Sequence, residues 1–242
     1  MSKLRSLLIT DPLIVLATIV CASASLITSL FDSSGRKQAA IATLWSKILL
    51  AVSGVRVKVE GLEKIPQNGS YVFVSNHASY MDTPVVLANI HVQFRFLAKR
   101  GLFQIPFLGW HLGRAGHISV PRGDARAAVK TMTTAAQIVR DRGVSLLIFP
   151  EGGRSRDGQI GPFKDGATYI AIRAGVPLVP MCLKGTREVL PFGSGNVRSG
   201  VVHMRIGDPI PTDQATTHDR ARLTEQLRNQ IIALMDEQPI HA

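Results

Sequence analysis

The chain has 242 residues, which is enough for one domain with a substantial core and an appendage, but short for two full domains. Its 28 Lys and Arg residues exceed its 17 Asp and Glu residues by 11, and such a basic surface suits an anionic partner or substrate. The two cysteines, Cys21 and Cys182, belong to no CxxC pair and to no His/Cys cluster. This cysteine pattern excludes a disulfide scaffold and indicates no zinc site.

The N-terminal part is apolar over residues 12–31, a run of 20 residues without a charge. A helix of that length crosses a bilayer core of about 30 Å. A second apolar stripe follows at helical spacings of three and four, with Lys37 and Lys47 placed to reach lipid headgroups. The stripe consists of Ile41, Leu44, Trp45, Ile48, Val52 and Val55.

This N-terminal part has several interpretations. Lys3, Arg5 and the segment Ala22-Ser23-Ala24 fit a cleaved signal peptide, although apolar residues continue well past that cleavage site. A single membrane span and a pair of buried helices are further alternatives. Because cations flank both ends of the first apolar run, the positive-inside rule gives no orientation. We expect a membrane-associated helical hairpin over residues 1–58, seated in one leaflet.

Residues 59–242 show short apolar runs that alternate with helical patterns, which indicates a single α/β domain. The helical segments are one capped by Asp124 and ended by Gly143, one over 167–174, and an amphipathic one over 219–235. We therefore predict an α/β fold with a mixed, largely parallel sheet flanked by helices. The predicted strands are residues 71–75, 93–98, 144–149, 177–183 and 201–206.

Polar residues follow the first of these strands in the segment 76–82, which contains His77 and Asp82. Histidine is the natural general base near neutral pH, and a carboxylate on its Nδ1–H fixes the tautomer that leaves Nε2 free. Five positions in a regular helix rotate side chains by about 140°, so the pair meets only if His77 precedes the helix and Asp82 begins it. The alternative is a surface turn with a helix cap.

Two further polar clusters follow predicted strands. In the segment 149–156, a glycine pair allows close backbone approach to a ligand, and Arg154 and Arg156 suit phosphate. In the segment 99–110, Lys99 and Arg100 precede an apolar, aromatic stretch, as a site for a charged headgroup beside an oily chain would require. Solvated turns and ordinary core packing are the alternatives for both clusters. In α/β folds, ligands bind where strands end.

These clusters resemble the sequence blocks of the glycerolipid acyltransferases of the PlsC type. His77 and Asp82 match the HX4D block, and Asn76 with residues 99–110 is similar to the second. The segment 149–155 resembles the FPEGTRS block, with Gly153 in place of the usual Thr, and residues 176–180 resemble the fourth. The resemblance covers residues 60–185, and the apolar hairpin is similar to the membrane-seating motif of bacterial members.

The resemblance implies acyl transfer from acyl-CoA or acyl carrier protein to the sn-2 hydroxyl of lysophosphatidic acid, giving phosphatidic acid. His77 is then the base and Asp82 its orienting carboxylate. The resemblance implies no metal and no cofactor beyond the acyl donor, and it implies membrane association at the cytoplasmic face of a bacterial inner membrane. Arg122 is an additional candidate for phosphate binding. The implied substrate-binding residues are Lys99, Arg100, Glu151, Gly152 and Arg154.

Other functions remain open from the sequence alone. An acyltransferase of the same family acting on another lyso-phospholipid or on an amino-acid lipid would carry the same motifs. A basic nucleic-acid-binding protein is suggested by the charge alone, whereas aromatic residues make up 6% of the chain and no recognised nucleic-acid motif occurs. We therefore expect membrane lipids as partners, and no nucleic acid.

Overall fold

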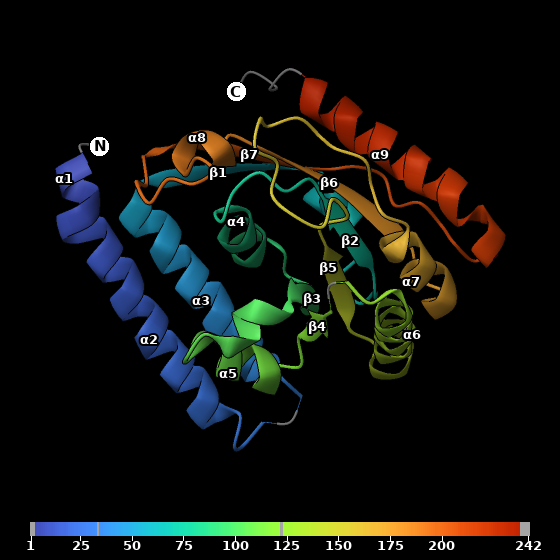
Figure 1. The fold of residues 1–242 in the computed structure, drawn as a ribbon, viewed down its shortest axis with the longest axis horizontal. Helices are drawn as coiled ribbons and strands as arrows, with labels where there is room; N and C mark the ends of the chain where they lie inside the picture. The colour runs from blue at the N-terminus through green and yellow to red at the C-terminus, as the bar shows by residue number, and fades with distance from the viewer. Residues whose placement is uncertain (1–2, 33, 122, 238–242) are drawn as a thin grey trace.

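The computed structural model describes residues 3–32, 34–121 and 123–237, so Arg122 lies outside the described residues. Its centre is a seven-stranded sheet in the order β1-β7-β6-β2-β5-β3-β4 (Figure 1). Neighbouring strands are parallel except β6 and β7, which confirms the predicted mixed, largely parallel sheet. The strands are β1 (Val55–Glu60), β2 (Val72–Ser75), β3 (Phe94–Lys99), β4 (Ile118–Val120), β5 (Ser145–Ile148), β6 (Leu178–Lys184) and β7 (Gly200–Ile206).

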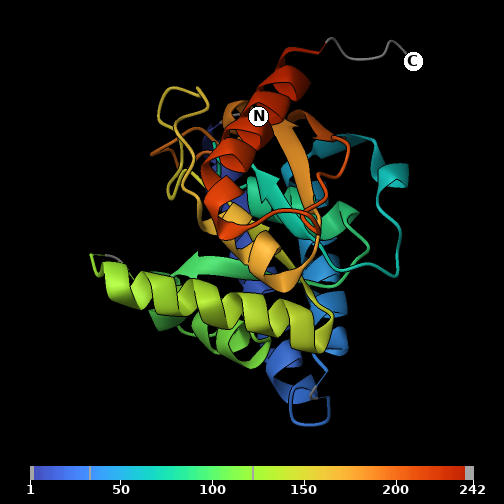
Figure 2. The ribbon, with the colours of Figure 1, turned by 90° about the vertical axis from the view of Figure 1, so that its right-hand side faces the viewer.

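Helices cover both faces of the sheet, each over its own apolar cluster. Figure 2 shows α6, α7 and α9 arranged over one face, while α3 and α4 lie against the other. The α-helices are α1 (Lys3–Arg5), α2 (Asp11–Thr28), α3 (Arg36–Ser53), α4 (Asp82–Asn89), α5 (Leu108–Arg114), α6 (Ala125–Arg142), α7 (Gly166–Ala174), α8 (Thr186–Val189) and α9 (Arg220–Asp236). Tighter or wider helical turns are η1 (Ser6–Thr10), η2 (Leu62–Lys64), η3 (Arg100–Gln104) and η4 (Thr217–Asp219).

The N-terminal helices α2 and α3 pack side by side as the predicted hairpin (Figure 1). The indole Nε1–H of Trp45 donates a hydrogen bond to Thr18 Oγ1 at 3.0 Å across their interface. The continuous helix over Ser6–Thr28 is long and apolar enough to cross a membrane by length and composition, and only 11% of its apolar 18-residue stretch is buried. Helix α3 in turn packs against α4 of the α/β domain.

The prediction that the apolar helical stripe of residues 41–55 extends to Val55 was wrong. Val55 instead begins strand β1 and is buried beside β7. Gly54 has φ +66° and ends α3 in the left-handed conformation, which turns the chain out of the helix. The predicted start and end of α6 are both confirmed. The Asp124 side chain accepts a hydrogen bond from Ala127 N at the start, and Gly143 ends the helix with φ +60°.

The carboxyl ends of β2, β5 and β3 meet at one edge of the sheet because these three strands are parallel neighbours. Beyond β2, the Asn76 side chain continues the pairing with β6. Its Nδ2 donates to Leu183 O at 2.9 Å, and its Oδ1 accepts from Leu183 N at 2.8 Å. This buried amide fixes where the chain leaves the sheet, and the next residue is His77.

Candidate active site

His77 and Asp82 are in direct contact at the end of β2. The Nδ1 atom of His77 lies 2.7 Å from Asp82 Oδ2. His77 is in the loop before α4, and Asp82 is the first residue of that helix, which is the arrangement that the spacing requires. The segment therefore brings the two predicted residues together within one short turn.

The Asp82 carboxylate is completely buried and strongly oriented. Its Oδ2 also accepts hydrogen bonds from the backbone N–H groups of Ala78 and Ser79, both at 2.8 Å. A carboxylate held in this way takes the Nδ1–H of His77 and leaves Nε2 as the basic atom. The His77 side chain is 18% exposed, and its ring stacks on Phe149 with centroids 4.1 Å apart. The His77 ring is thus fixed in orientation and still reachable from outside.

Glu151 lies behind His77. Its Oε1 accepts a hydrogen bond from His77 N at 3.1 Å, and the nearby Ser155 N donates to His77 O at 2.7 Å. Burial raises the pKa of Glu151 to about 7, and the hydrogen bond from His77 N–H opposes that rise. Glu151 therefore holds the backbone of His77, and it does not line the cavity beside that residue.

Arg154 lies between two aromatic rings near His77 and Asp82, which we call the dyad. Its guanidinium carbon is 3.6 Å from the ring centroid of Tyr80 and 4.7 Å from that of Phe192. The Phe192 ring also contacts Arg156, whose guanidinium carbon lies 5.5 Å from the ring centroid. Such cation–π contacts restrict a flexible arginine and leave its N–H groups for an anion. Tyr80 stands between the two dyad residues in sequence, but nothing in the sequence signals Phe192.

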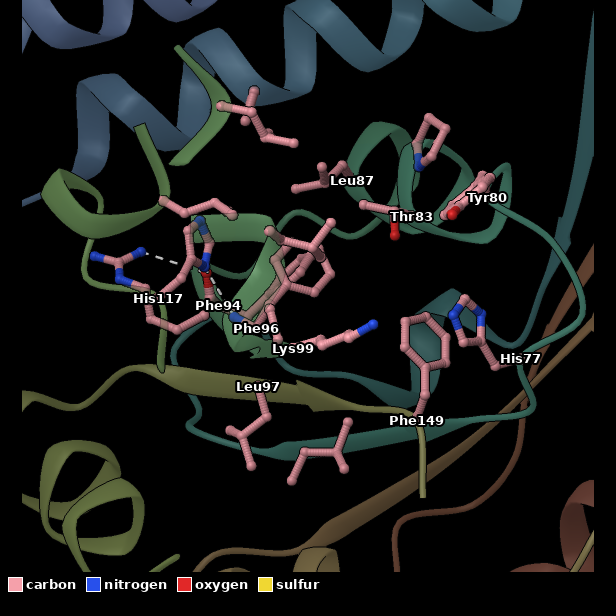
Figure 3. Close-up of a pocket in the computed structure, with 18 of the residues that line it drawn as sticks. His77, Tyr80, Thr83, Leu87, Phe94, Phe96, Leu97, Lys99, His117 and Phe149 are labelled. Carbon is pink, nitrogen blue, oxygen red and sulfur yellow. Dashed lines mark hydrogen bonds between the residues drawn. The ribbon is translucent and has the colours of Figure 1, made fainter. Parts of the chain in front are cut away.

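Lys99 and Lys164 add two cations to the site, and Gly152 leaves room for Lys164. Gly152 has φ +73°, and a Cβ there would lie 2.8 Å from the Nζ of Lys164. A side chain at this position would therefore displace Lys164, which the sequence analysis did not identify. Lys99 ends β3 and extends into the cavity toward Phe149 and His77 (Figure 3).

A large cavity of about 2610 Å³ opens beside the dyad. Figure 3 shows His77 and Lys99 at one part of it, with Phe94, Phe96 and Leu87 along its apolar part. Side chains of α2, α3, α4, β3 and α5 line it. Four of the residues predicted for the site line this cavity, namely His77, Lys99, Gly152 and Arg154. The other three, Asp82, Arg100 and Glu151, are not among the lining residues that the structure describes.

Residues 56–184 match the family model described as Acyltransferase, which is more than half of the chain. The chain belongs to the acyltransferase family. The matched region runs from β1 to the end of β6, so it contains every predicted site residue that the structure describes.

Named relatives of this chain come from plants and from mammals. The chloroplastic 1-acyl-sn-glycerol-3-phosphate acyltransferase of Brassica napus is 37% identical over 86% of this chain and 59% of its own length. The alpha enzyme of that name from Homo sapiens is 30% identical over 76% of this chain and 65% of its own. This chain therefore spans about three fifths of the length of the curated relatives it matches.

A solved structure matches this acyltransferase over almost its whole length. It is the crystal structure of the 1-acyl-sn-glycerophosphate acyltransferase PlsC from Thermotoga maritima, with a TM-score of 0.80 and 26% sequence identity. The match covers 99% of this chain and 100% of that one, so the α2–α3 hairpin lies within the shared architecture.

Proposed function

We propose that this protein is a 1-acyl-sn-glycerol-3-phosphate acyltransferase, which acylates the sn-2 hydroxyl of lysophosphatidic acid to give phosphatidic acid. The observation that carries the proposal is the contact between His77 Nδ1 and Asp82 Oδ2 beside a large cavity. The names of the relatives support the choice of acceptor.

In the proposed reaction, His77 Nε2 takes the proton of the sn-2 hydroxyl as its oxygen attacks the thioester carbonyl. The new ester C–O bond forms, the thioester C–S bond breaks, and the proton passes from His77 to the departing thiolate. Asp82 holds the tautomer throughout and stabilises the imidazolium through its hydrogen bond to Nδ1. A thiolate is a good leaving group, so positioning and a base supply most of the catalysis.

Both parts of the acceptor, its phosphate and its acyl chain, have a matching surface in this site. Arg154, held between its two aromatic rings, and Lys99 provide cations for the acceptor phosphate. The apolar wall of β3 and α4 offers the acyl chain a place out of water, next to the base. The donor is acyl-CoA or acyl carrier protein, since both present the same thioester.

The α2–α3 hairpin suits a protein held on a membrane surface. Its outer helix exposes large apolar side chains along most of its length, which favours contact with lipid over contact with water. On this proposal the hairpin seats the enzyme in one leaflet, and the α/β domain lies on the cytoplasmic face of a bacterial inner membrane.

The test is acyl transfer by membranes that contain the protein, with labelled acyl-CoA or acyl carrier protein and a panel of lyso-lipid acceptors. We expect phosphatidic acid from lysophosphatidic acid, and none from membranes containing His77→Ala at the same protein level. Transfer to a different lyso-lipid alone would overturn the acceptor and keep the chemistry. No transfer from either donor to any acceptor would overturn the enzymatic proposal.

A further inference from the structure

The segment between β3 and β4 carries a group of large apolar side chains to the protein surface. Ile105, Phe107 and Trp110 are 45%, 36% and 57% exposed, and we call these three residues the η3–α5 knob. The rings of Phe107 and Trp110 lie 5.4 Å apart, so they form one apolar projection. Ile105 also borders the cavity, but no contact described above for His77, Asp82 or Arg154 involves the knob, and the proposed reaction does not use its outer surface.

The knob has a strained backbone. Phe107 has φ +62° and ψ −56°, and it is the one non-glycine residue with positive φ among the residues that the structure describes. Leu108 N donates to Pro106 O at 2.7 Å, which closes a γ-turn of the rare, strained form. Backbone strain of this kind persists mainly in functional segments, and here it directs an aromatic side chain outward.

The turn is also closely packed from behind. A Cβ on Gly109 would collide with the backbone carbonyl of Phe103, so only glycine allows this approach of α5 to η3. The amide of Gly109 additionally bonds Ile105 O at 2.7 Å. The knob is therefore a compact projection on a fixed base, in contrast to an extended loop.

The knob is continuous with the hairpin. The hydrogen bond between Ser25 Oγ and His111 Nδ1, at 2.6 Å, joins α2 to α5, and Figure 1 shows α5 beside the lower part of the hairpin. Cations flank the knob at both ends, since Arg100 and Arg114 are exposed. Aromatic rings and apolar tips between cations are the pattern of segments that enter the headgroup layer of an anionic membrane.

We propose that the η3–α5 knob inserts into the headgroup region of an anionic leaflet and forms a second membrane contact beside α2. The occupant of this surface is lipid, because α5 packs beside α2, whose large apolar side chains are exposed, and because the arginines that flank the knob complement anionic headgroups. Because the hairpin and the α/β domain pack as one unit, the contact fixes the rotation of the whole protein about the axis of α2, which a single helix in the membrane leaves free. It is independent of the acceptor that the enzyme uses.

The tryptophans of the chain allow a direct test, since there are two, Trp45 and Trp110. Trp45 is bonded to Thr18 inside the hairpin, so Trp45→Phe leaves Trp110 as the single reporter of the knob. The full-length variant is reconstituted into phosphatidylcholine vesicles with and without phosphatidylglycerol, and flotation selects the vesicle-bound protein. Trp110→Phe, which keeps Trp45, is the matched control.

We expect the emission of Trp110 to shift to shorter wavelength on phosphatidylglycerol vesicles, and lipids brominated near the headgroup to quench it. Adding Phe107→Ser and Ile105→Ser to the Trp110-only protein should reverse most of the shift while circular dichroism stays unchanged. Vesicle-bound protein whose Trp110 keeps a water-exposed emission and remains open to acrylamide would overturn the proposal. That result would leave the knob as a site for another protein.

Discussion

Replacing Asp82 by Asn removes the charge of the orienting carboxylate and keeps its shape. In the structure, Asp82 Oδ2 accepts three hydrogen bonds, from His77 Nδ1 and from the N–H groups of Ala78 and Ser79. The two backbone donors require an oxygen at this position, so they orient the Asn amide with its oxygen toward His77. The correct tautomer of His77 is therefore retained in Asp82→Asn, and the variant isolates the effect of charge.

The expected loss follows from that single change. A hydrogen bond to a charged group contributes about 1.5–3 kcal/mol, and each 1.36 kcal/mol corresponds to about tenfold in rate. We therefore expect Asp82→Asn to lower kcat by about 10–150-fold and to change KM for the acceptor little. In Ser-His-Asp triads the equivalent change costs about 10⁴-fold because the tautomer is wrong. The smaller loss predicted here results from the backbone N–H groups of Ala78 and Ser79.

The assay is the initial rate of thiol release at saturating donor and acceptor, for wild type, Asp82→Asn, Asp82→Ala and His77→Ala. The Ala variant at Asp82 should lose more activity than the Asn variant, since it loses orientation as well as charge. A kcat for Asp82→Asn within about twofold of wild type would show that the charge has no role. A loss as large as that of His77→Ala, in a folded protein, would show that the tautomer is not held by the backbone.

Three other changes probe the surroundings of the dyad. Arg154→Ala should raise KM for lysophosphatidic acid about 10–150-fold with kcat retained, and an equal change with an acceptor whose phosphate is esterified would contradict phosphate binding. Tyr80→Leu should raise the same KM about 2–30-fold, while Tyr80→Phe keeps the wild-type value, because the ring contact is worth about 0.5–2 kcal/mol. The raised pKa of Glu151, about 7 against an ordinary 4.5, means that its contribution to stability is complete below pH 4.5 and is lost as pH rises through about 7. The Tm of wild type should thus fall relative to Glu151→Gln between about pH 5 and about pH 8, and a constant difference in Tm would refute this.

The sequence predicted the elements whose signals are local. Five strands are apolar runs between glycines, prolines and polar residues, and α6 has both a capping Asp124 and a terminal Gly143. Strand β1 was missed because its first valine continues the spacing of the stripe in α3. Strand β4, over Ile118–Val120, is too short for a period-two pattern to show. The order of strands depends on which runs pack together, and no local signal specifies it.

The site, too, contains residues that local sequence predicts and residues that only the folded chain brings together. His77 and Asp82 could be found because a single turn brings them together, and the glycine pair marks the loop that passes behind them. Phe192 could not be found, because it comes from the loop after α8 and meets Arg154 only in the folded chain. Lys164 is likewise placed by folding, and its Nζ occupies space that a side chain at Gly152 would take. Residues whose role depends on long-range contact need the structure.

The hairpin and the base are parts of one packed unit. Helix α3 contacts α2 on one side and α4 on the other, and α4 begins at Asp82. On the proposed function, with α2 and the η3–α5 knob in a leaflet, this packing would hold His77 at a fixed height and orientation relative to the lipid surface. A lyso-lipid keeps its chain in the leaflet and presents its hydroxyl and phosphate at the headgroup layer, the level at which Arg154 would meet it. On that proposal the acceptor would react without leaving the membrane, which would avoid the energetic cost of moving a long acyl chain through water.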